Sequence, residues 1–193
     1  MEAFSIAITM MAYTMMRVQE YTQPVVEPVV YEVPAYQLSA RAYLEPEDPY
    51  SIESCWAAWD ENQKEYLYDL CEEYDLDYRI MGGVIYNESN FIPTAVGHNT
   101  NGTSDWGLGQ INDVCYSFVK QHVNINSMED LLDPYKNMRA MCAIMDYHKD
   151  ATGDDVKALL RYQVGEGAYA RMMARGETST VTQAQVLAFA NKL

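Results

Sequence analysis

Residues 88–112 read ESNFIPTAVGHNTNGTSDWGLGQIN and interrupt a sequence that is otherwise patterned for helices. The stretch shows no helical period. Residue types typical of turns recur through it, at Asn90, Pro93, Gly97, Asn99, Asn101, Gly102, Ser104, Gly107 and Gly109. Functional residues commonly lie in a long irregular segment of this kind inside a helical domain. We therefore expect a mainly α fold in which residues 88–112 form a long irregular active-site loop.

Capping patterns and apolar periodicity predict helices on both sides of that loop. The expected helices run from Asp60 through Tyr74, from Tyr78 to about Asn87, from Asp133 to His148 or Lys149, from Gly153 onward and from Thr180 onward. The second of them contains the pair Gly82 and Gly83. Paired glycines in a buried helix usually mean that another backbone passes close to it.

The composition is that of an acidic globular protein. Hydrophobic residues make up 49% of the 193 residues and charged residues 21%, so the chain is expected to fold. With 13 Lys and Arg against 28 Asp and Glu, its formal net charge is -15 at pH 7. Such a surface repels phosphate backbones, which excludes nucleic acid as a partner and leaves a neutral glycan open. The carboxylates between Glu53 and Asp77 predict a solvated helical face.

The first 50 residues differ from the rest of the chain. Residues 1–16 contain a 14-residue run without charge, about the length of the apolar region of an export signal and too short for a spanning helix. We expect an export signal or membrane anchor there, and therefore an exported, extracellular or envelope-associated protein. Residues 17–50 hold five of the seven prolines and predict an extended Pro/Glu-rich linker, with a strand-addition peptide as the alternative. The folded domain is expected over residues 51–193.

The cysteine pattern leaves two interpretations open. Cys55, Cys71, Cys115 and Cys142 are an even number, as two disulfides in an exported protein would require. Cys71 and Cys142 also lie on apolar helical stripes, which fits buried reduced thiols equally well. Since no pair has the Cys-x-x-Cys spacing and the three histidines complete no zinc pattern, we expect no metal site.

Glu88 is the carboxylate that the sequence singles out. It is expected at the C-terminal end of a helix and is followed by the apolar Phe91 and Ile92. The negative end of the helix dipole and partial desolvation both raise the pKa of a carboxyl placed there. A carboxyl that stays protonated near neutral pH can protonate the leaving oxygen of a glycosidic bond. The alternative is an exposed glutamate at a helix end.

Three blocks around this residue carry a family resemblance. ESNFIPTA at 88–95, DWGLGQIN at 105–112 and ALLRYQVGEG at 158–167 resemble, in order and spacing, the three motifs of the SLT-type lytic transglycosylases. These are enzymes of the lysozyme superfamily that cut peptidoglycan. The resemblance covers residues from about 60 to 175 and implies a lysozyme-like, goose-type fold with no cofactor. The form NGTSDWGLGQIN is most similar to small members that serve secretion and conjugation machines, which adds such an apparatus to the expected partners.

The resemblance also implies roles for individual residues. Glu88 corresponds to the catalytic acid/base, and the expected substrate-binding positions are Ser89, Gln110, Tyr162 and Gln163. The chain departs from the family at Gly109, where Met is usual, and at Gln163, where Asn is usual. Gln keeps the amide but places it one methylene further out.

The loop resembles animal lysozymes as well, and this comparison places their second catalytic carboxylate at Asn101, a further substrate-binding candidate. With an amide there, Glu88 would perform both proton transfers. It would thereby form the 1,6-anhydro product of a lytic transglycosylase that cleaves the β-1,4 bond between MurNAc and GlcNAc. The alternative is a hydrolytic muramidase in which Asp105 supplies the second carboxylate, although a loop-capping role for Asp105 is favoured. A glycan-binding module without activity is the third interpretation.

Overall fold

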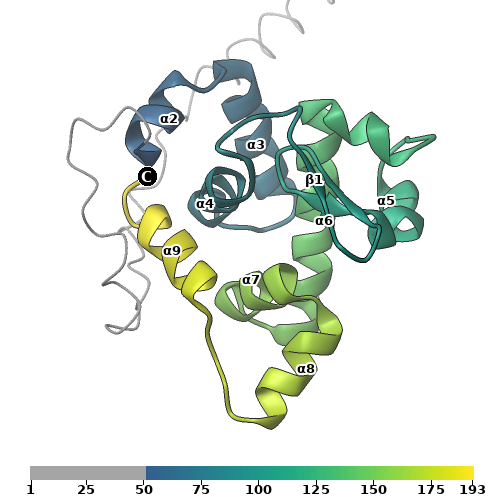
Figure 1. Cartoon of the computed structure of the whole chain (residues 1–193). Helices are drawn as coiled ribbons and strands as arrows, with labels where there is room; N and C mark the ends of the chain where they lie inside the picture. Colours follow the sequence, from purple (N-terminus) through teal and green to yellow (C-terminus); the bar gives the residue numbers. More distant parts are fainter. Residues whose placement is uncertain (1–50) are drawn as a thin grey trace, which may run out of the picture. The chain divides into compact units, whose positions relative to one another are not determined.

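A computed structural model describes residues 51–193. The export signal or anchor expected at residues 1–16 and the linker expected at residues 17–50 lie outside the described residues. The described part is mainly helical, as expected, and it also contains one small sheet (Figure 1). Within it, no helix is both long enough and apolar enough to cross a membrane.

The helices and strands follow one another from residue 52 to residue 190. The α-helices are α2 (Ile52–Ala58), α3 (Glu61–Glu73), α4 (Tyr78–Ser89), α5 (Tyr116–His122), α6 (Pro134–Thr152), α7 (Asp155–Val164), α8 (Glu166–Ala174) and α9 (Val181–Ala190). The strands are β1 (Val96–His98), β2 (Ser104–Trp106) and β3 (Ile111–Asn112), and the short 3-10 helices are η2 (Asp113–Cys115) and η3 (Met128–Leu132).

The core forms around α4, which lies between α3 and α9 in Figure 1. Residues 80–86 of α4 are all buried. A Cβ added at Gly83 would lie 2.9 Å from the carbonyl oxygen of Val186 in α9. The prediction that another backbone passes the glycine pair is therefore confirmed, and it explains why α4 needs small residues at this point.

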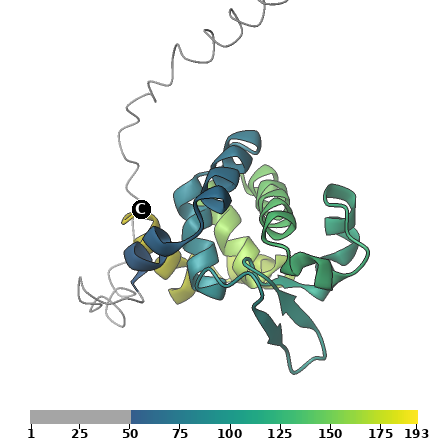
Figure 2. The same cartoon turned by 90° about the horizontal axis from the view of Figure 1, so that it is seen from above.

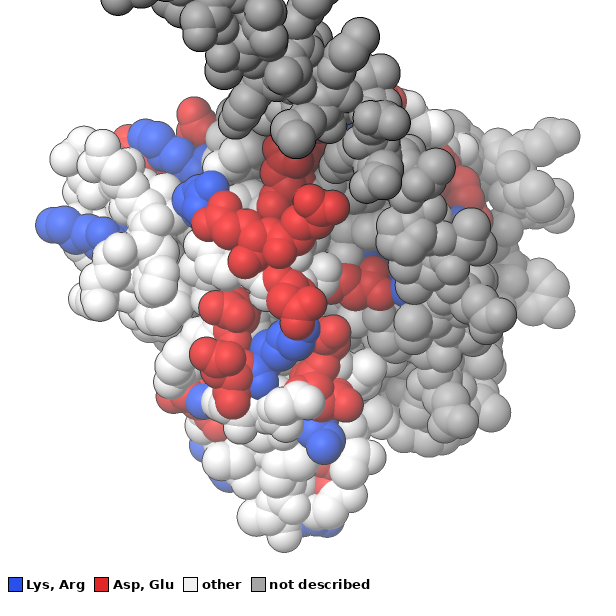
Figure 3. Space-filling view, turned by 180° about the vertical axis from the view of Figure 1, so that it is seen from behind, with Lys and Arg blue, Asp and Glu red and all other residues white. Residues whose placement is uncertain are grey.

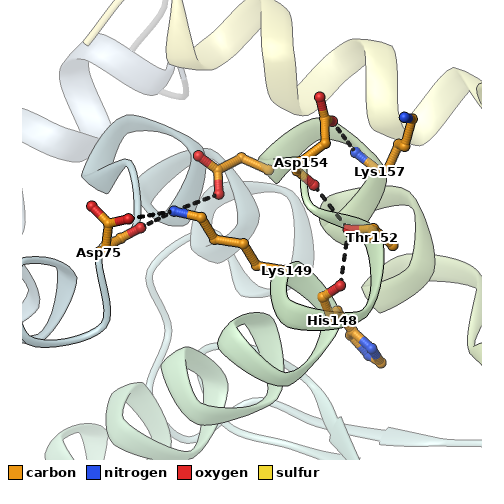
Figure 4. A network of polar contacts seen from close by, with 7 residues as sticks. Asp75, His148, Lys149, Thr152, Asp154 and Lys157 are labelled. Atoms are coloured by element: carbon orange, nitrogen blue, oxygen red, sulfur yellow. Dashed lines mark hydrogen bonds and ion pairs between the residues drawn. The ribbon is translucent and has the colours of Figure 1, made fainter.

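The predicted helix starts are confirmed by their caps. The Asp60 carboxylate accepts a hydrogen bond from the backbone N–H of Gln63 at the start of α3, and Thr180 caps α9 in the same way. The helix α6 ends at Thr152, beyond the predicted His148 or Lys149. The Thr152 hydroxyl donates to the carbonyl of His148, and Lys149 pairs with Asp75, so this last turn is held from both sides (Figure 4).

Part of the stretch expected to be irregular is a three-stranded antiparallel sheet in the order β1-β2-β3. Figure 2 shows the β1–β2 hairpin projecting from the helices. Asp105 lies in the middle of the central strand, where it is paired with Gly97 on one side and Asn112 on the other. Strands of two or three residues are too short to show the alternating pattern that identifies a strand from sequence.

The acidic segment forms a solvated face, as predicted. Figure 3 shows Asp and Glu side chains gathered on the side of the molecule that faces away in Figure 1. Among the carboxylates of residues 53–77, all are exposed except Asp77, which caps α4 and pairs with Arg79 at 2.6 Å.

Within residues 51–193 no disulfide joins any two of the four cysteines. Cys71 of α3 and Cys142 of α6 are both buried, and a hydrogen bond between them together with burial raises the pKa of the Cys142 thiol. For this pair the structure agrees with the interpretation as buried reduced thiols. The described residues hold no cluster of His, Cys, Asp and Glu that could bind a metal ion.

Candidate active site

A cleft of about 880 Å³ opens where the end of α4, the sheet and the helices α6 and α7 meet. Its lining includes Glu88 and residues from the stretch 99–118, from 144–148 of α6 and from 162–166. Of the residues predicted for the site, the structure brings Glu88, Asn101, Gln110, Tyr162 and Gln163 into this one cleft.

Glu88 lies in the last turn of α4, which ends because Asn90 adopts a left-handed backbone with φ of 51°. Burial raises the pKa of the Glu88 carboxyl from its ordinary value of 4.5 to about 7, and the negative charge of Asp105 adds to the increase. A hydrogen bond from the side chain of Asn87, at 3.4 Å, acts in the opposite direction. The Glu88 carboxyl therefore keeps its proton to much higher pH than an ordinary glutamate, as a general acid requires.

Asp105 is a further carboxylate in the cleft, whose lining also includes Glu166. Its Oδ2 accepts a hydrogen bond from Asn99 Nδ2 at 2.8 Å, and its Oδ1 accepts one from Asn112 Nδ2 at 2.7 Å. Two neutral donors orient this carboxylate without neutralising its charge. The negative charge of Asp105 also raises the pKa of Glu88. Asp105 therefore lines the cleft, as the muramidase alternative requires, and its hydrogen bonds to Asn99 and Asn112 also hold the loop, as the capping interpretation requires.

Asn101 lies in the turn between β1 and β2. Its side-chain oxygen accepts hydrogen bonds from the backbone N–H of Thr103 at 3.0 Å and from the Thr103 hydroxyl at 2.8 Å. The side chain thus closes its own turn. It borders the cleft, but its oxygen is already committed to Thr103.

Gln110 braces the loop that carries the middle motif. Its Nε2 donates to the carbonyls of Ala95 at 3.2 Å and Gly107 at 2.9 Å. Its own backbone is left-handed, with φ of 46°. The amide N–H groups are therefore used within the protein, and the carbonyl oxygen is the atom of this side chain left for a substrate.

Tyr162 connects α7 to the same loop. Its hydroxyl donates to the carbonyl of Gly109 at 2.8 Å, and burial together with the charge of Glu88 raises its pKa well above the ordinary value. A Cβ at position 109 would lie 2.8 Å from this hydroxyl and 3.0 Å from Met141 Sδ. Met141 of α6 thus packs where a side chain at position 109 would be, which accounts for glycine at a position where the family usually has methionine.

Ser89 lies outside the cleft lining. Its side chain is buried, and its hydroxyl donates to the carbonyl of Ile85 one turn back along α4, at 3.0 Å. In this structure Ser89 supports the helix end that carries Glu88 and does not face the cleft.

Asn137 of α6 was missed by the sequence analysis, although it holds the site together. It is fully buried; its Oδ1 accepts from the N–H of Gly109, and its Nδ2 donates to the carbonyls of Trp106 and Leu131, each at 2.8 Å. A Cβ at Gly107 would collide with the same amide. A buried Asn within an apolar helical stripe was the available signal, since such a side chain needs partners.

His148 and Gln163 line the cleft beside Tyr162. Within the described residues, His148 Nδ1 and both side-chain polar atoms of Gln163 are buried without a hydrogen-bond partner. Gln163 was predicted to bind substrate, whereas His148, on an apolar helix face, gave no signal that would separate it from a core residue.

The mainly helical fold, with its cleft at the end of α4, is that of the lysozyme-like class of glycan-cleaving domains. More particularly, the chain belongs to the transglycosylase SLT domain family, whose model matches residues 66–182, the segment that contains Glu88, Asp105 and Tyr162. No match is found among curated proteins. Membership supports action on the glycan strands of peptidoglycan, the substrate of this family's lytic transglycosylases.

Proposed function

We propose that this chain is a peptidoglycan lytic transglycosylase that cleaves the β-1,4 bond between MurNAc and GlcNAc, with Glu88 as acid and then base. The observation that carries the proposal is the position of Glu88 in the cleft with its pKa raised to about 7. A carboxyl with this pKa is protonated often enough to act as an acid near neutral pH and ionises readily enough to act as a base afterwards.

In the first step, the protonated Glu88 gives its proton to the oxygen that bridges the two sugars. The bond between that oxygen and C1 of MurNAc breaks, and positive charge develops on the MurNAc ring. We expect the Asp105 carboxylate, which Asn99 and Asn112 hold in the same cleft, to help stabilise this charge.

In the second step, the Glu88 carboxylate removes the proton from the C6 hydroxyl of the same MurNAc. The C6 oxygen attacks C1, and the ring closes to the 1,6-anhydro sugar. Glu88 ends the cycle protonated, so no water is consumed and the acid is restored.

A hydrolytic muramidase is the second candidate, and Asp105 is the observation that favours it. Retaining glycosidases pair a protonated acid with a second, ionised carboxylate. Here Glu88 and Asp105 line one cleft and interact electrostatically. In this reaction Glu88 would deprotonate water, which attacks C1 and leaves an ordinary reducing end.

Mass spectrometry of the ends released from purified peptidoglycan tests both candidates. Anhydro ends are lighter than reducing ends by one water. We expect the wild-type chain to release anhydro ends, and Glu88→Gln to lose roughly 10² to 10⁴ in rate, the usual contribution of a positioned acid. Full activity in Glu88→Gln would refute the assignment of the acid.

Asp105→Asn is the matched second variant, because it removes the charge and keeps the shape. Reducing ends from the wild type, lost in Asp105→Asn, would show that the protein is a muramidase. Anhydro ends that persist in Asp105→Asn would support Glu88 as the single acid/base. Tight glycan binding that neither substitution affects, with no ends released, would support a binding module instead.

We also propose that the chain acts in the cell envelope or outside the cell, where its substrate lies, with residues 1–16 as export signal or anchor. The form of residues 101–112 further supports a role beside a secretion or conjugation apparatus. Recovery of the full chain from envelope fractions, with its N-terminus determined by mass spectrometry, tests the first point. Co-purification with a cross-linked apparatus tests the second.

A further inference from the structure

One turn at the border of the cleft has a chemically reactive sequence. It joins β1 to β2 and contains Asn101 and Gly102, and Asn101 is the one asparagine of the chain that precedes a glycine. The backbone nitrogen of the following residue can attack the amide carbon of an asparagine. Glycine hinders this attack least, because it has no side chain and adopts many backbone conformations. Asn101 is therefore the asparagine whose neighbour most favours loss of the amide.

The turn is exposed and leaves room for this reaction. Figure 2 shows the β1–β2 hairpin projecting from the helices, and Asn101 and Gly102 are both exposed in its turn. Gly102 has a φ of 85°, and a Cβ built on it would meet nothing within 4 Å. Its N–H donates to the carbonyl of Asn99 at 3.0 Å. This hydrogen bond must open before the nitrogen can attack, which an exposed turn permits.

The hydrogen bonds of Asn101 hold its side chain in a way that assists such an attack. Its Oδ1 accepts from the backbone N–H of Thr103 at 3.0 Å and from the Thr103 hydroxyl at 2.8 Å. The hydroxyl itself accepts from Asn99 Nδ2 at 3.2 Å and Asn112 Nδ2 at 3.0 Å, so its own hydrogen is directed at Asn101. Negative charge develops on Oδ1 when a nitrogen attacks Cγ, and these two donors stabilise that charge. Among the described residues, no hydrogen bond retains Nδ2, the atom that must leave.

We propose that Asn101 is a site of self-modification, at which the protein loses an amide and gains a carboxylate on the lining of the cleft. The Gly102 nitrogen forms a bond to Asn101 Cγ, the bond between Cγ and Nδ2 breaks, and the nitrogen leaves as ammonia with the proton of the Gly102 N–H. Water then opens the cyclic imide to aspartate or isoaspartate. An amide and water thus become a carboxylic acid and ammonia, and nothing is oxidised or reduced.

The new carboxylate would change the electrostatics of the cleft, and this consequence rests on the proposed function. The titratable groups that share the cleft lining with Glu88 are Asp105, Cys115, Tyr147, His148, Tyr162 and Glu166. Of these, Asp105 carries the charge that raises the pKa of Glu88. A carboxylate at position 101 adds a negative charge to the same lining, so it should raise the pKa of Glu88 further. The modified chain should therefore stay active to higher pH than the newly made chain.

The first test follows the amide itself and depends on no activity. The full chain is incubated at alkaline pH, where the backbone nitrogen gives up its proton more readily, and is mapped at intervals by proteolysis and mass spectrometry. Asn124 and Asn126 are internal controls, because both are exposed and neither precedes a glycine. We expect progressive loss of the amide at Asn101 and its retention at both controls. Retention of the amide at Asn101, or equal loss at all three positions, would overturn the inference.

Two variants test the chemistry of this loss. Asn101→Gln should abolish it, because the amide carbon of glutamine lies one methylene further from the Gly102 nitrogen. Thr103→Val should slow it, because Oδ1 then keeps only the backbone donor, whereas Thr103→Ser keeps the hydroxyl and should lose the amide as the wild type does. Equal rates of loss in the wild type and in both Thr103 variants would overturn the role assigned to the Thr103 hydroxyl.

The consequence for the cleft is tested with the product made directly. Asn101→Asp carries the new carboxylate, and Asn126→Asp is the matched control, because it adds the same charge outside the cleft lining. Glycan release from purified peptidoglycan is measured across pH. We expect the alkaline fall in rate to shift to higher pH in Asn101→Asp and to stay in place in Asn126→Asp. Identical profiles in all three chains would overturn the effect on Glu88. If the wild type releases no glycan at any pH, the proposed function fails, and the mapping of Asn101 still decides whether the amide is lost.

Discussion

Replacing Glu88 with glutamine should make the domain more stable at neutral and alkaline pH. The folded state raises the pKa of Glu88 from 4.5 to about 7, so between these values the folded chain binds more protons than the unfolded chain. The free energy of unfolding of the wild type therefore falls as pH rises through this window and levels off above it, as far as Glu88 is concerned. A shift of this size corresponds to about 3.4 kcal/mol, which solvent at the open cleft reduces to about 2 kcal/mol.

Glutamine does not titrate, so the Glu88→Gln chain avoids this loss. The difference in unfolding free energy between the variant and the wild type should be near zero at pH 4 and grow to about 2 kcal/mol in favour of the variant at pH 8. Urea unfolding at a series of pH values measures it, with Glu129→Gln as the control, because Glu129 is exposed on η3. If the curves of Glu88→Gln and wild type stay parallel from pH 4 to pH 8, the raised pKa of Glu88 is refuted.

Three further predictions follow from the same geometry. The rate of glycan release by the wild type should fall about tenfold per pH unit above pH 7, as Glu88 loses its proton; a turbidity assay that stays flat to pH 9 would contradict this. Asn137→Ala should lower the unfolding free energy by about 2 to 4 kcal/mol, because the buried groups that it satisfies lose their partner; a loss below about 0.5 kcal/mol in urea unfolding would argue against a bracing role. Gly83→Ala should cost about 1 to 3 kcal/mol by the same measurement, whereas Gly167→Ala, whose Cβ would meet Arg171 Nη1 at an ordinary 3.5 Å, should cost nothing; equal effects would refute the close approach of α9.

The helices could be predicted because their signals are local. A cap such as Asp60 acts within four residues of itself, and the glycine pair of α4 indicates a neighbouring backbone without saying which one. That neighbour is α9, about a hundred residues later in the chain. The helix α6 extends beyond its predicted end because of non-local contacts as well. Lys149 in its last turns pairs with Asp75, which belongs to a different segment of the chain.

The surroundings of Asp105 could not be predicted by counting along the loop, and the sheet explains why. Side chains alternate across a strand, so in β2 the side chain of Asp105 lies on the opposite face from those of Ser104 and Trp106. The indole of Trp106 is held by Asp113 on one face, whereas Asp105 meets Asn99 and Asn112 on the other. Asn101 is in the turn, where a short polar side chain closes the backbone. Both residues line the cleft, but how each side chain is held there depends on a strand register that the sequence does not display.

The residues of the middle motif mostly hold the site in shape and contribute less to its chemistry. Gly107 leaves room for the Asn137 amide, and Gln110 binds the carbonyls of Ala95 and Gly107. Such residues keep the cleft in shape whether water or the C6 hydroxyl attacks the sugar. A motif of this kind therefore indicates the family and the position of the acid. It does not decide whether water or the C6 hydroxyl attacks the sugar in the second step, which depends on Asp105 and on the access of water to the cleft. The identity of the released ends under Asp105→Asn is thus the observation that separates the two reactions, because this substitution alters the charge in the cleft and leaves the support provided by Asn137 and Gln110 intact.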